Sequence, residues 1–291
     1  MSWKPENVIF SSDFVNKVLT ETISKQNLEA FEYSILKGIH LTLEDCCAWQ
    51  EFSRSVRAIY QRYDCVVISG LHPEGDGRSL IAAMSILGKC FLSYGDDQIV
   101  KYLAMSPWSR DLARRGDEGF FHTDLNASPS PPALTGIQCI TPDPGAPQFG
   151  HNRIARIDDI LEQLGKDRAH AALYFLTNEE VAMANDRSAG LWQGRLYDNG
   201  ILRFHPETIR TACDRRGLPA PDMILKAIQR AATKVSEPLS LKQGDILLFS
   251  NHRTMHYRSE CSVKFNHFPM DFEARKVHIL HSRNEREHVT V

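Results

Sequence analysis

Glu-Gly-Phe-Phe-His-Thr-Asp-Leu, residues 118–125, is a short run with two adjacent phenylalanines that we expect to form a β-strand. Side chains along a strand alternate between its two faces, so His122 and Asp124 would point the same way. An imidazole and a carboxylate on one face can bind the same divalent metal. A second imidazole would complete a facial triad that leaves three coordination positions open. The run therefore predicts part of a metal site.

Two other histidines are followed two residues later by an acid, His72 before Glu74 and His205 before Glu207. Each of these pairs has a proline at its centre, which fits a turn or the start of a helix better than a central strand. Only the pair at 122 and 124 lies in a plausible strand. Its context, and not the short motif alone, selects it as a metal-site candidate.

A third ligand should come from another strand of the same core. Residues 243–251 predict a turn at Gly244 that leads into a buried apolar strand, and His256 follows shortly after it. His252 is the rival candidate. Because it comes directly after the expected strand exit at Asn251, we expect the turn to point its side chain outward.

The remaining pattern predicts helices followed by many short strands. The first ninety residues are mostly helical in periodicity, interrupted by a buried strand over 64–71 and followed by a helix over 79–92. The other expected strands are 99–104, 134–140, 171–176, 201–204, 245–249 and 275–281, with helices at 154–164 and 222–233 and a hairpin turn at Asn199-Gly200. We therefore expect a mainly β fold with flanking helices around a double-stranded β-helix, or jelly-roll, core.

Domain organisation follows from the same pattern. The 291 residues contain no low-complexity linker, so we expect a single domain over 1–291. Its N-terminal part, to about residue 95, is expected to be helix-rich, and residues from about 96 to 291 are expected to form the jelly-roll core with insertions.

Charge and composition exclude several functional classes. The 34 basic and 36 acidic residues nearly balance, which argues against a nucleic-acid partner and against a polybasic membrane protein. We find no apolar run long enough to span a membrane and no signal peptide, so we expect a cytoplasmic location. The seven cysteines are irregularly spaced, which favours reduced thiols over a cysteine-based zinc site.

Taken together, these features resemble the non-haem iron, 2-oxoglutarate-dependent oxygenases of the taurine dioxygenase and clavaminate synthase group. The resemblance covers roughly residues 60–283, most of the chain. The segments that carry it are 63–71, Phe-His-Thr-Asp at 121–124, Pro-Pro-Ala-Leu-Thr-Gly at 131–136, Pro-Asp-Pro-Gly at 142–145, 244–251 and His-Tyr-Arg at 256–258.

The resemblance implies that His122, Asp124 and His256 hold Fe²⁺ and that the keto-acid end of 2-oxoglutarate chelates the same ion. The far carboxylate of this cosubstrate needs a buried cation, ideally a guanidinium. Arg275 is our preferred candidate because Arg275, Val277 and Ile279 share one face of an expected strand, whereas Arg258 and Arg283 are alternatives.

One turn departs from the pattern of similar proteins. They usually carry a Gly-Gly-(acid)-Thr turn whose hydroxyl helps to hold the cosubstrate. The present sequence has Gly-Ala-Pro-Gln-Phe-Gly at 145–150, where Gln148 is the candidate replacement because an amide can donate to a carboxylate.

The activity implied is coupling of the oxidative decarboxylation of 2-oxoglutarate by O₂ to the hydroxylation of a small polar metabolite, such as an amino acid or an amino-acid derivative. Because halogenating relatives lack the carboxylate at the position of Asp124, its presence favours hydroxylation. Residues 126–132 and 177–200 could form a lid. Within or near these segments, Asn126, Trp192 and Arg203 are the substrate-contact candidates.

Three alternatives remain open. The same iron centre could carry out desaturation or cyclisation. The fold could instead serve as a non-catalytic sensor that binds metal and 2-oxoglutarate, or as a zinc or manganese jelly-roll enzyme such as a cupin-type isomerase. The sequence does not determine the oligomeric state. His278, His281 and His288 are expected to be surface residues of the C-terminal segment.

Overall fold

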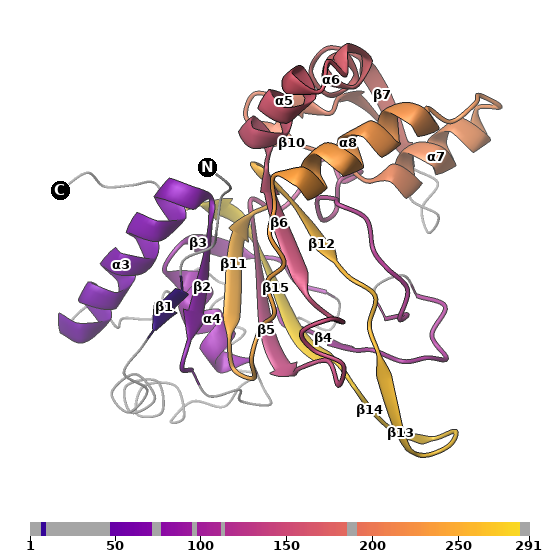
Figure 1. Cartoon of the computed structure of the whole chain (residues 1–291). Coiled ribbons are helices and arrows are strands. Elements are labelled where there is room, and N and C mark those ends of the chain that lie inside the picture. The colour runs from indigo at the N-terminus through magenta and orange to yellow at the C-terminus, as the bar shows by residue number, and fades with distance from the viewer. Residues whose placement is uncertain are drawn as a thin grey trace.

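A large mixed sheet forms the centre of the computed structural model, which describes residues 7–9, 47–71, 77–94, 98–111, 114–184 and 191–285 (Figure 1). The strand order is β1-β2-β11-β5-β15-β3, and β4 pairs with β15 outside this path. Only the β1–β2 pair is parallel in this sheet. The strands are β1 Asn7–Ile9, β2 Cys65–Ser69, β3 Gly88–Phe91, β4 Lys101–Ala104, β5 Leu134–Thr141, β11 Ile246–Ser250 and β15 Lys276–Glu285.

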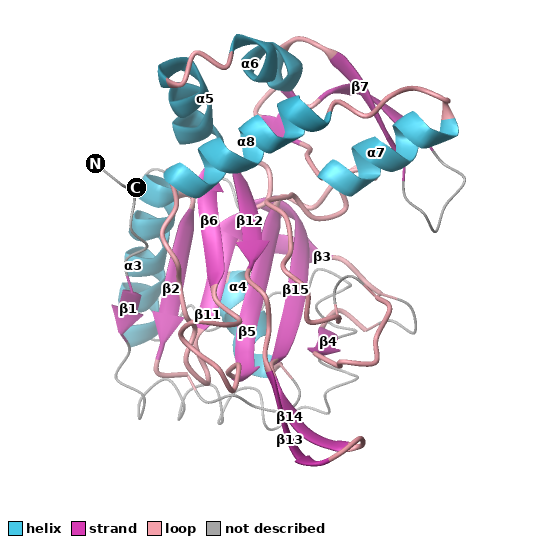
Figure 2. Ribbon diagram, turned by 45° about the vertical axis from the view of Figure 1, so that its right-hand side comes forward, coloured by secondary structure: helices cyan, strands magenta, loops and turns pink. Residues whose placement is uncertain are grey.

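A smaller antiparallel pair, β6 (Asn152–Arg156) and β12 (Thr254–Arg258), faces this sheet (Figure 2). Apolar side chains fill the space between the two layers. They include Ile137 of β5, Phe249 of β11 and Val277 of β15, which pack with Ile154 of β6. Two strand layers around an apolar core are the jelly-roll arrangement, so the predicted fold class is confirmed.

Helices cover the outside of this core. Helices α3 (Cys47–Tyr63) and α4 (Arg78–Ser85) pack on the outer face of the large sheet. Four further helices follow β6 in the chain and gather beyond one end of the strands (Figure 1), where they bury an apolar cluster of their own. They are α5 Ile157–Lys166, α6 His170–Thr177, α7 Pro206–Arg215 and α8 Asp222–Lys234. No described helix is long and apolar enough to cross a membrane.

Three short hairpins complete the described residues. Two accompany the group of four helices, and the third projects from the far end of the core, where β13 and β14 are labelled in Figure 1. Their strands are β7 Glu180–Ala184 with β8 Leu191–Arg195, β9 Tyr197–Asp198 with β10 Ile201–Leu202, and β13 Val263–His267 with β14 Asp271–Ala274.

Most sequence-based elements are confirmed, but three outside the 118–125 run need correction. Residues 171–176 form helix α6 and not a strand, because a continuous apolar run has no periodicity that separates a buried strand from a buried helix. The helix expected over 154–164 begins only at Ile157, after the end of β6, and the one expected over 79–92 gives way to β3 at Gly88. The helical pattern before residue 46 lies outside the described residues.

A buried carboxylate links the segments that enter the two layers. Asp64, just before β2, accepts hydrogen bonds from Arg156 Nε (2.9 Å) at the end of β6 and from Arg253 Nε (2.5 Å) in the β11–β12 turn. Arg253 also pairs with Glu285 at 3.0 Å. Asp64 has a φ of 57°, a left-handed conformation that aspartate and asparagine tolerate better than most residues. This carboxylate therefore holds the β11–β12 turn against the large sheet.

We predict that Asp64→Asn destabilises the fold by about 2 kcal/mol, because two arginines lose their shared carboxylate while the local backbone preference is kept. Urea unfolding followed by circular dichroism measures this change. Asp158→Asn is the matched control, since Asp158 is exposed and lies 3.8 Å from the same Arg156. Equal effects of the two substitutions would contradict the role given to Asp64.

Candidate metal centre

The first structural feature of the site is a backbone bridge between His122 and His256. The amide of each residue donates to the carbonyl of the other, both at 2.9 Å. Three residues earlier, the Gly119 amide donates to Arg258 O at 2.9 Å. A Cβ at Gly119 would lie only 3.2 Å from that carbonyl, so glycine allows residues 119–122 to run close along β12. Two histidines 134 residues apart are thereby placed side by side.

The expected strand over 118–125 does not form: within this run only His122 makes an isolated bridge, to His256. Leu125 has a φ of 48°, and residues 124–127 form a turn. The side-chain amide of Asn251 holds this turn by accepting from the Asp124 amide at 2.7 Å and donating to the Asp124 carbonyl at 3.1 Å. Asp124 therefore faces His122 because Asn251 fixes a turn, and not because side chains alternate along a strand.

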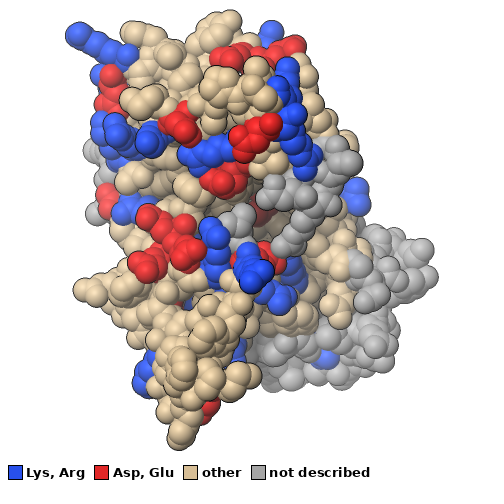
Figure 3. Space-filling model, turned by 90° about the vertical axis from the view of Figure 1, so that its right-hand side faces the viewer, with Lys and Arg blue, Asp and Glu red and all other residues tan. Residues whose placement is uncertain are grey.

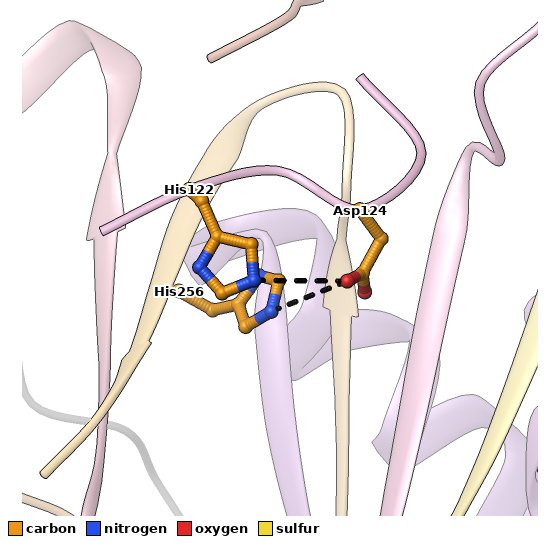
Figure 4. Close-up of side chains that lie close together, drawn as sticks. All are labelled: His122, Asp124 and His256. Carbon is orange, nitrogen blue, oxygen red and sulfur yellow. Dashed lines mark ion pairs between the residues drawn. The ribbon is translucent and has the colours of Figure 1, made fainter. Parts of the chain in front are cut away.

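The three predicted ligand residues do come together (Figure 4). One potential ligand atom from each of His122, Asp124 and His256 lies within 4.8 Å of the others. Asp124 Oδ1 is 3.8 Å from His122 Nε2 and 3.6 Å from His256 Nε2, too long for hydrogen bonds. The three atoms thus converge on one point, with long ion-pair contacts (dashed in Figure 4) and no hydrogen bonds between them.

A row of side chains on the inner face of the large sheet supports these residues. Phe249, Thr135 and His281 are direct neighbours across β11, β5 and β15. The Phe249 ring lies 4.8 Å from the His256 ring, centre to centre. Thr135 Oγ1 donates to Asp124 Oδ2 at 3.0 Å, and His281 Nε2 lies 2.9 Å from the same oxygen. His281 is buried, so its expected surface position is wrong, as is that of the buried His278.

The histidines of the site are held in specific states. His122 Nδ1 lies 2.7 Å from Phe120 O, so it carries the proton and leaves Nε2 as a free donor atom for a metal. Burial lowers the pKa of His256 to about 3, with a further lowering from neighbouring His122, and burial alone lowers the pKa of His281 to about 3. Burial also holds the pKa of His205, whose ring centre is 4.9 Å from that of His122, well below its usual value.

A cavity of about 950 Å³ opens beside the ligands, and the face in Figure 3 is hollowed near its centre. His122 and Asp124 lie in its wall beside Phe120 and Leu125. Charged lining residues of both signs come from the segment before His122, from α7 and from β12: Arg110, Asp111, Arg115, Asp117, Glu118, Glu207 and Arg258. Ser128 of the loop after Asp124 and Trp192 of β8 also line the cavity. The site is therefore open to a molecule of metabolite size.

Arg275 lies just before β15 and is buried. Its Nη2 is 3.4 Å from Asn152 Oδ1 of β6, and no described carboxylate lies within ion-pair distance of it. Burial lowers the pKa of the guanidinium, although an arginine remains charged. Arg275 is thus a buried cation between the two strand layers.

The other residues considered for binding 2-oxoglutarate are either occupied by backbone carbonyls or exposed. The Arg258 guanidinium donates to the carbonyls of Arg115 (3.1 Å) and Asp117 (2.9 Å), so it holds the loop that leads to His122. Gln148 is exposed in the turn between β5 and β6, and Arg283 is exposed on β15. His252 Nε2 is 3.3 Å from Pro131 O, and it is not a member of the ligand cluster.

The substrate candidates Asn126, Trp192 and Arg203 form one structural unit. Arg203 donates to the carbonyls of Asn126 (2.9 Å) and Pro129 (3.1 Å) and also to that of Ser128. Trp192 covers the guanidinium, with 4.9 Å between Arg203 Cζ and the ring centre. This unit fixes the loop after Asp124 as one wall of the cavity.

No protein-family model matches the sequence, and no curated protein matches it. Solved structures do share its fold. An asparagine oxygenase in complex with Fe(II), 2S,3S-3-hydroxyasparagine and succinate matches with a TM-score of 0.65 at 14% identity, over 94% of this chain and 92% of that one. OrfP, a non-haem iron oxygenase in complex with Fe and alpha-ketoglutaric acid, matches with a TM-score of 0.67 at 14% identity, over 96% and 94%. PvcB from Pseudomonas aeruginosa matches with a TM-score of 0.55 at 14% identity, over 79% of each chain. The expected resemblance to non-haem iron oxygenases is therefore confirmed at the level of the fold.

The buried neutral histidines predict acid sensitivity of the metal-free protein. His256 and His281 are neutral when folded but take up a proton near pH 6.5 when unfolded. Their contribution to stability is therefore complete above about pH 6.5 and declines as the pH falls toward 3, by up to about 1.4 kcal/mol per pH unit for each residue.

Urea unfolding in the presence of a chelator at pH 7, 6 and 5 tests this expectation. The free energy of unfolding should fall with pH, and His281→Gln should reduce the slope because one titrating group is removed. A slope that His281→Gln leaves unchanged would count against the assignment of His281 as a neutral buried base.

Proposed function

We propose that this protein is an Fe(II)/2-oxoglutarate-dependent oxygenase that hydroxylates a small polar metabolite, such as an amino acid or an amino-acid derivative. The observation that carries the proposal is the convergence of His122, Asp124 and His256 beside an open cavity. The fold shared with iron oxygenases supports it.

The residues present fit a ferrous ion. Two imidazoles and one carboxylate are the donor set of non-haem iron sites with open positions. Because His122 Nδ1 is occupied by Phe120 O and burial keeps His256 neutral, both rings can offer Nε2 to the metal. His122, Asp124 and His256 would hold the ion. When bound, iron supplies the oxidative chemistry in which 2-oxoglutarate, O₂ and a C–H bond give succinate, CO₂ and a hydroxylated product.

Arg275 is the residue that we assign to the far carboxylate of 2-oxoglutarate. It lies two residues before Val277, whose side chain packs between the strand layers, and it has no described acidic partner. A buried guanidinium without a carboxylate leaves donors for a bidentate pair with a ligand. Arg258 is the weaker candidate, since backbone carbonyls already accept from it.

The cavity supports a small and polar substrate. Its described lining mixes arginines with acids and lacks the basic groove that a nucleic acid requires. Phe120 and Leu125 lie beside the ligands and can exclude water from the reacting carbon. One neighbour is bound to hydroxyasparagine, and OrfP is bound to L-Arg or its hydroxylated forms. On this basis we propose that the substrate of the present protein is also an amino acid or an amino-acid derivative. Arg203 and Trp192 would shape the pocket wall.

Succinate formation tests the proposed reaction. Purified protein supplied with Fe²⁺, ascorbate, 2-oxoglutarate and a panel of amino acids and their derivatives should release succinate faster when the true substrate is present. Zn²⁺ should inhibit. Activity with zinc in the absence of iron, or no metal-dependent decarboxylation with any panel member, would favour the cupin-type or the sensor interpretation.

The ligand assignment has its own test. His122→Ala, Asp124→Ala and His256→Ala should each abolish iron-dependent succinate formation while leaving the circular dichroism spectrum unchanged, because each removes a metal donor. His252→Ala is the matched control and should remain active, since His252 is close in sequence but outside the cluster. Full activity in any of the three ligand variants would refute the assignment.

Arg275→Gln should raise the 2-oxoglutarate concentration needed for half-maximal turnover by about 10- to 100-fold, the loss expected for hydrogen bonds to a charged group. Steady-state kinetics with 2-oxoglutarate varied provide the measurement. Arg258→Gln is the control and should change this requirement much less. The reverse order of the two effects would transfer the role to Arg258.

A further inference from the structure

The two oxygens of the Asp124 carboxylate have different surroundings. Oδ2 lies within hydrogen-bond distance of two side chains, Thr135 Oγ1 at 3.0 Å and His281 Nε2 at 2.9 Å. Oδ1 has no such partner among the described residues and faces the two histidine Nε2 atoms at 3.8 and 3.6 Å. The carboxylate is therefore oriented before any metal arrives.

Both donors are fixed by the large sheet. Thr135 and His281 are direct cross-strand partners of β5 and β15, near the middle of the sheet order. Thr135 is fully buried and His281 is 5% exposed, so neither side chain has room to turn away. Donors carried on paired central strands hold a group more rigidly than donors on loops.

The hydrogen-bond direction at His281 is also defined. A carboxylate can only accept, so Nε2 must carry the proton. The other ring nitrogen, Nδ1, is buried and has no hydrogen-bond partner. A neutral imidazole with its proton on Nε2 satisfies both conditions: Nε2 donates to the carboxylate, and Nδ1 carries no N–H that needs an acceptor. His281 thus occupies Oδ2 without adding a positive charge beside the metal position.

We propose that Thr135 and His281 form a positioning pair that reserves Oδ2, so that Asp124 binds the metal through Oδ1 alone. The inference rests on the proposed function. Its consequence is that the carboxylate takes one coordination position and not two, leaving three positions for the cosubstrate chelate and a third small ligand. Without the pair, the carboxylate could rotate, offer both oxygens to the ion and compete with the keto-acid chelate.

Calorimetry with Mn²⁺ and 2-oxoglutarate tests the pair without turnover. Five proteins are compared: wild type, His281→Phe, His281→Gln, Thr135→Val and His278→Phe. Phe keeps the ring volume but removes the donor, whereas Gln keeps an N–H that can reach Oδ2. His278 is the matched control because it is a buried histidine of the same strand, three residues away, and belongs to neither the ligand cluster nor the hydrogen bonds to Asp124.

We expect His281→Phe to weaken the binding of 2-oxoglutarate to the Mn²⁺-saturated protein by about 10- to 100-fold, the usual range for loss of a group that orients a metal ligand. Thr135→Val should act in the same direction with a smaller effect. His281→Gln should restore most of the affinity, and His278→Phe should leave it near wild type. Thermal unfolding of each protein confirms that it is folded.

The outcomes separate the two proposals. If the wild-type protein binds neither Mn²⁺ nor 2-oxoglutarate, the proposed function fails. If the wild-type protein binds both and His281→Phe leaves 2-oxoglutarate affinity unchanged, the positioning pair is overturned, even where Mn²⁺ affinity falls. Equal losses in His281→Phe and His278→Phe would likewise overturn it, since they would reflect general damage to β15.

Discussion

Two backbone hydrogen bonds between His122 and His256 are the constraint on which the site depends. They join chain segments 134 residues apart, with a long insertion containing α5 to α8 between them. The entropic cost of closing a loop grows only slowly with its length, so such an insertion is tolerated as long as both ends are anchored. Asp64 provides one anchor by holding the β11–β12 turn through Arg253, and Asn251 provides another by holding the turn at Asp124. The positions of the ligand residues are thus set by backbone hydrogen bonds and by these two anchoring side chains.

The charges of the buried groups then determine which ligands the site can bind. Burial keeps His256 and His281 neutral, so neither of these rings adds a positive charge beside Asp124. The site also retains buried ring nitrogens without hydrogen bonds, at Nδ1 of His256 and of His281. Such groups cost stability and are typical of sites shaped for a ligand. A divalent cation at the cluster would compensate the carboxylate, and Arg275, which forms no ion pair with a described acid, would compensate an anionic cosubstrate.

The sequence predicted which residues meet at the site better than it predicted the local structure that brings them together. The jelly-roll class and the meeting of His122, Asp124 and His256 could be inferred from motif order, yet the strand that was expected to align the first two does not form, and only an isolated bridge at His122 is present. Asn251 could not be identified in advance, because its role depends on a turn that no periodicity encodes. His281 was predictable: the alternation that placed Arg275, Val277 and Ile279 on one face reaches His281 at the next step. The strand expected at 171–176 failed because its apolar run carries no period.

We propose that one iron ion binds between these three side chains, with 2-oxoglutarate reaching toward Arg275. A crystal structure of the protein soaked anaerobically with Fe²⁺ and 2-oxoglutarate, with anomalous data collected at the iron edge, tests it most directly. We expect a single iron peak roughly 2 Å from His122 Nε2, Asp124 Oδ1 and His256 Nε2, with the far carboxylate of 2-oxoglutarate on the Arg275 guanidinium. An iron peak elsewhere, or iron bound with the cosubstrate directed away from Arg275, would contradict it.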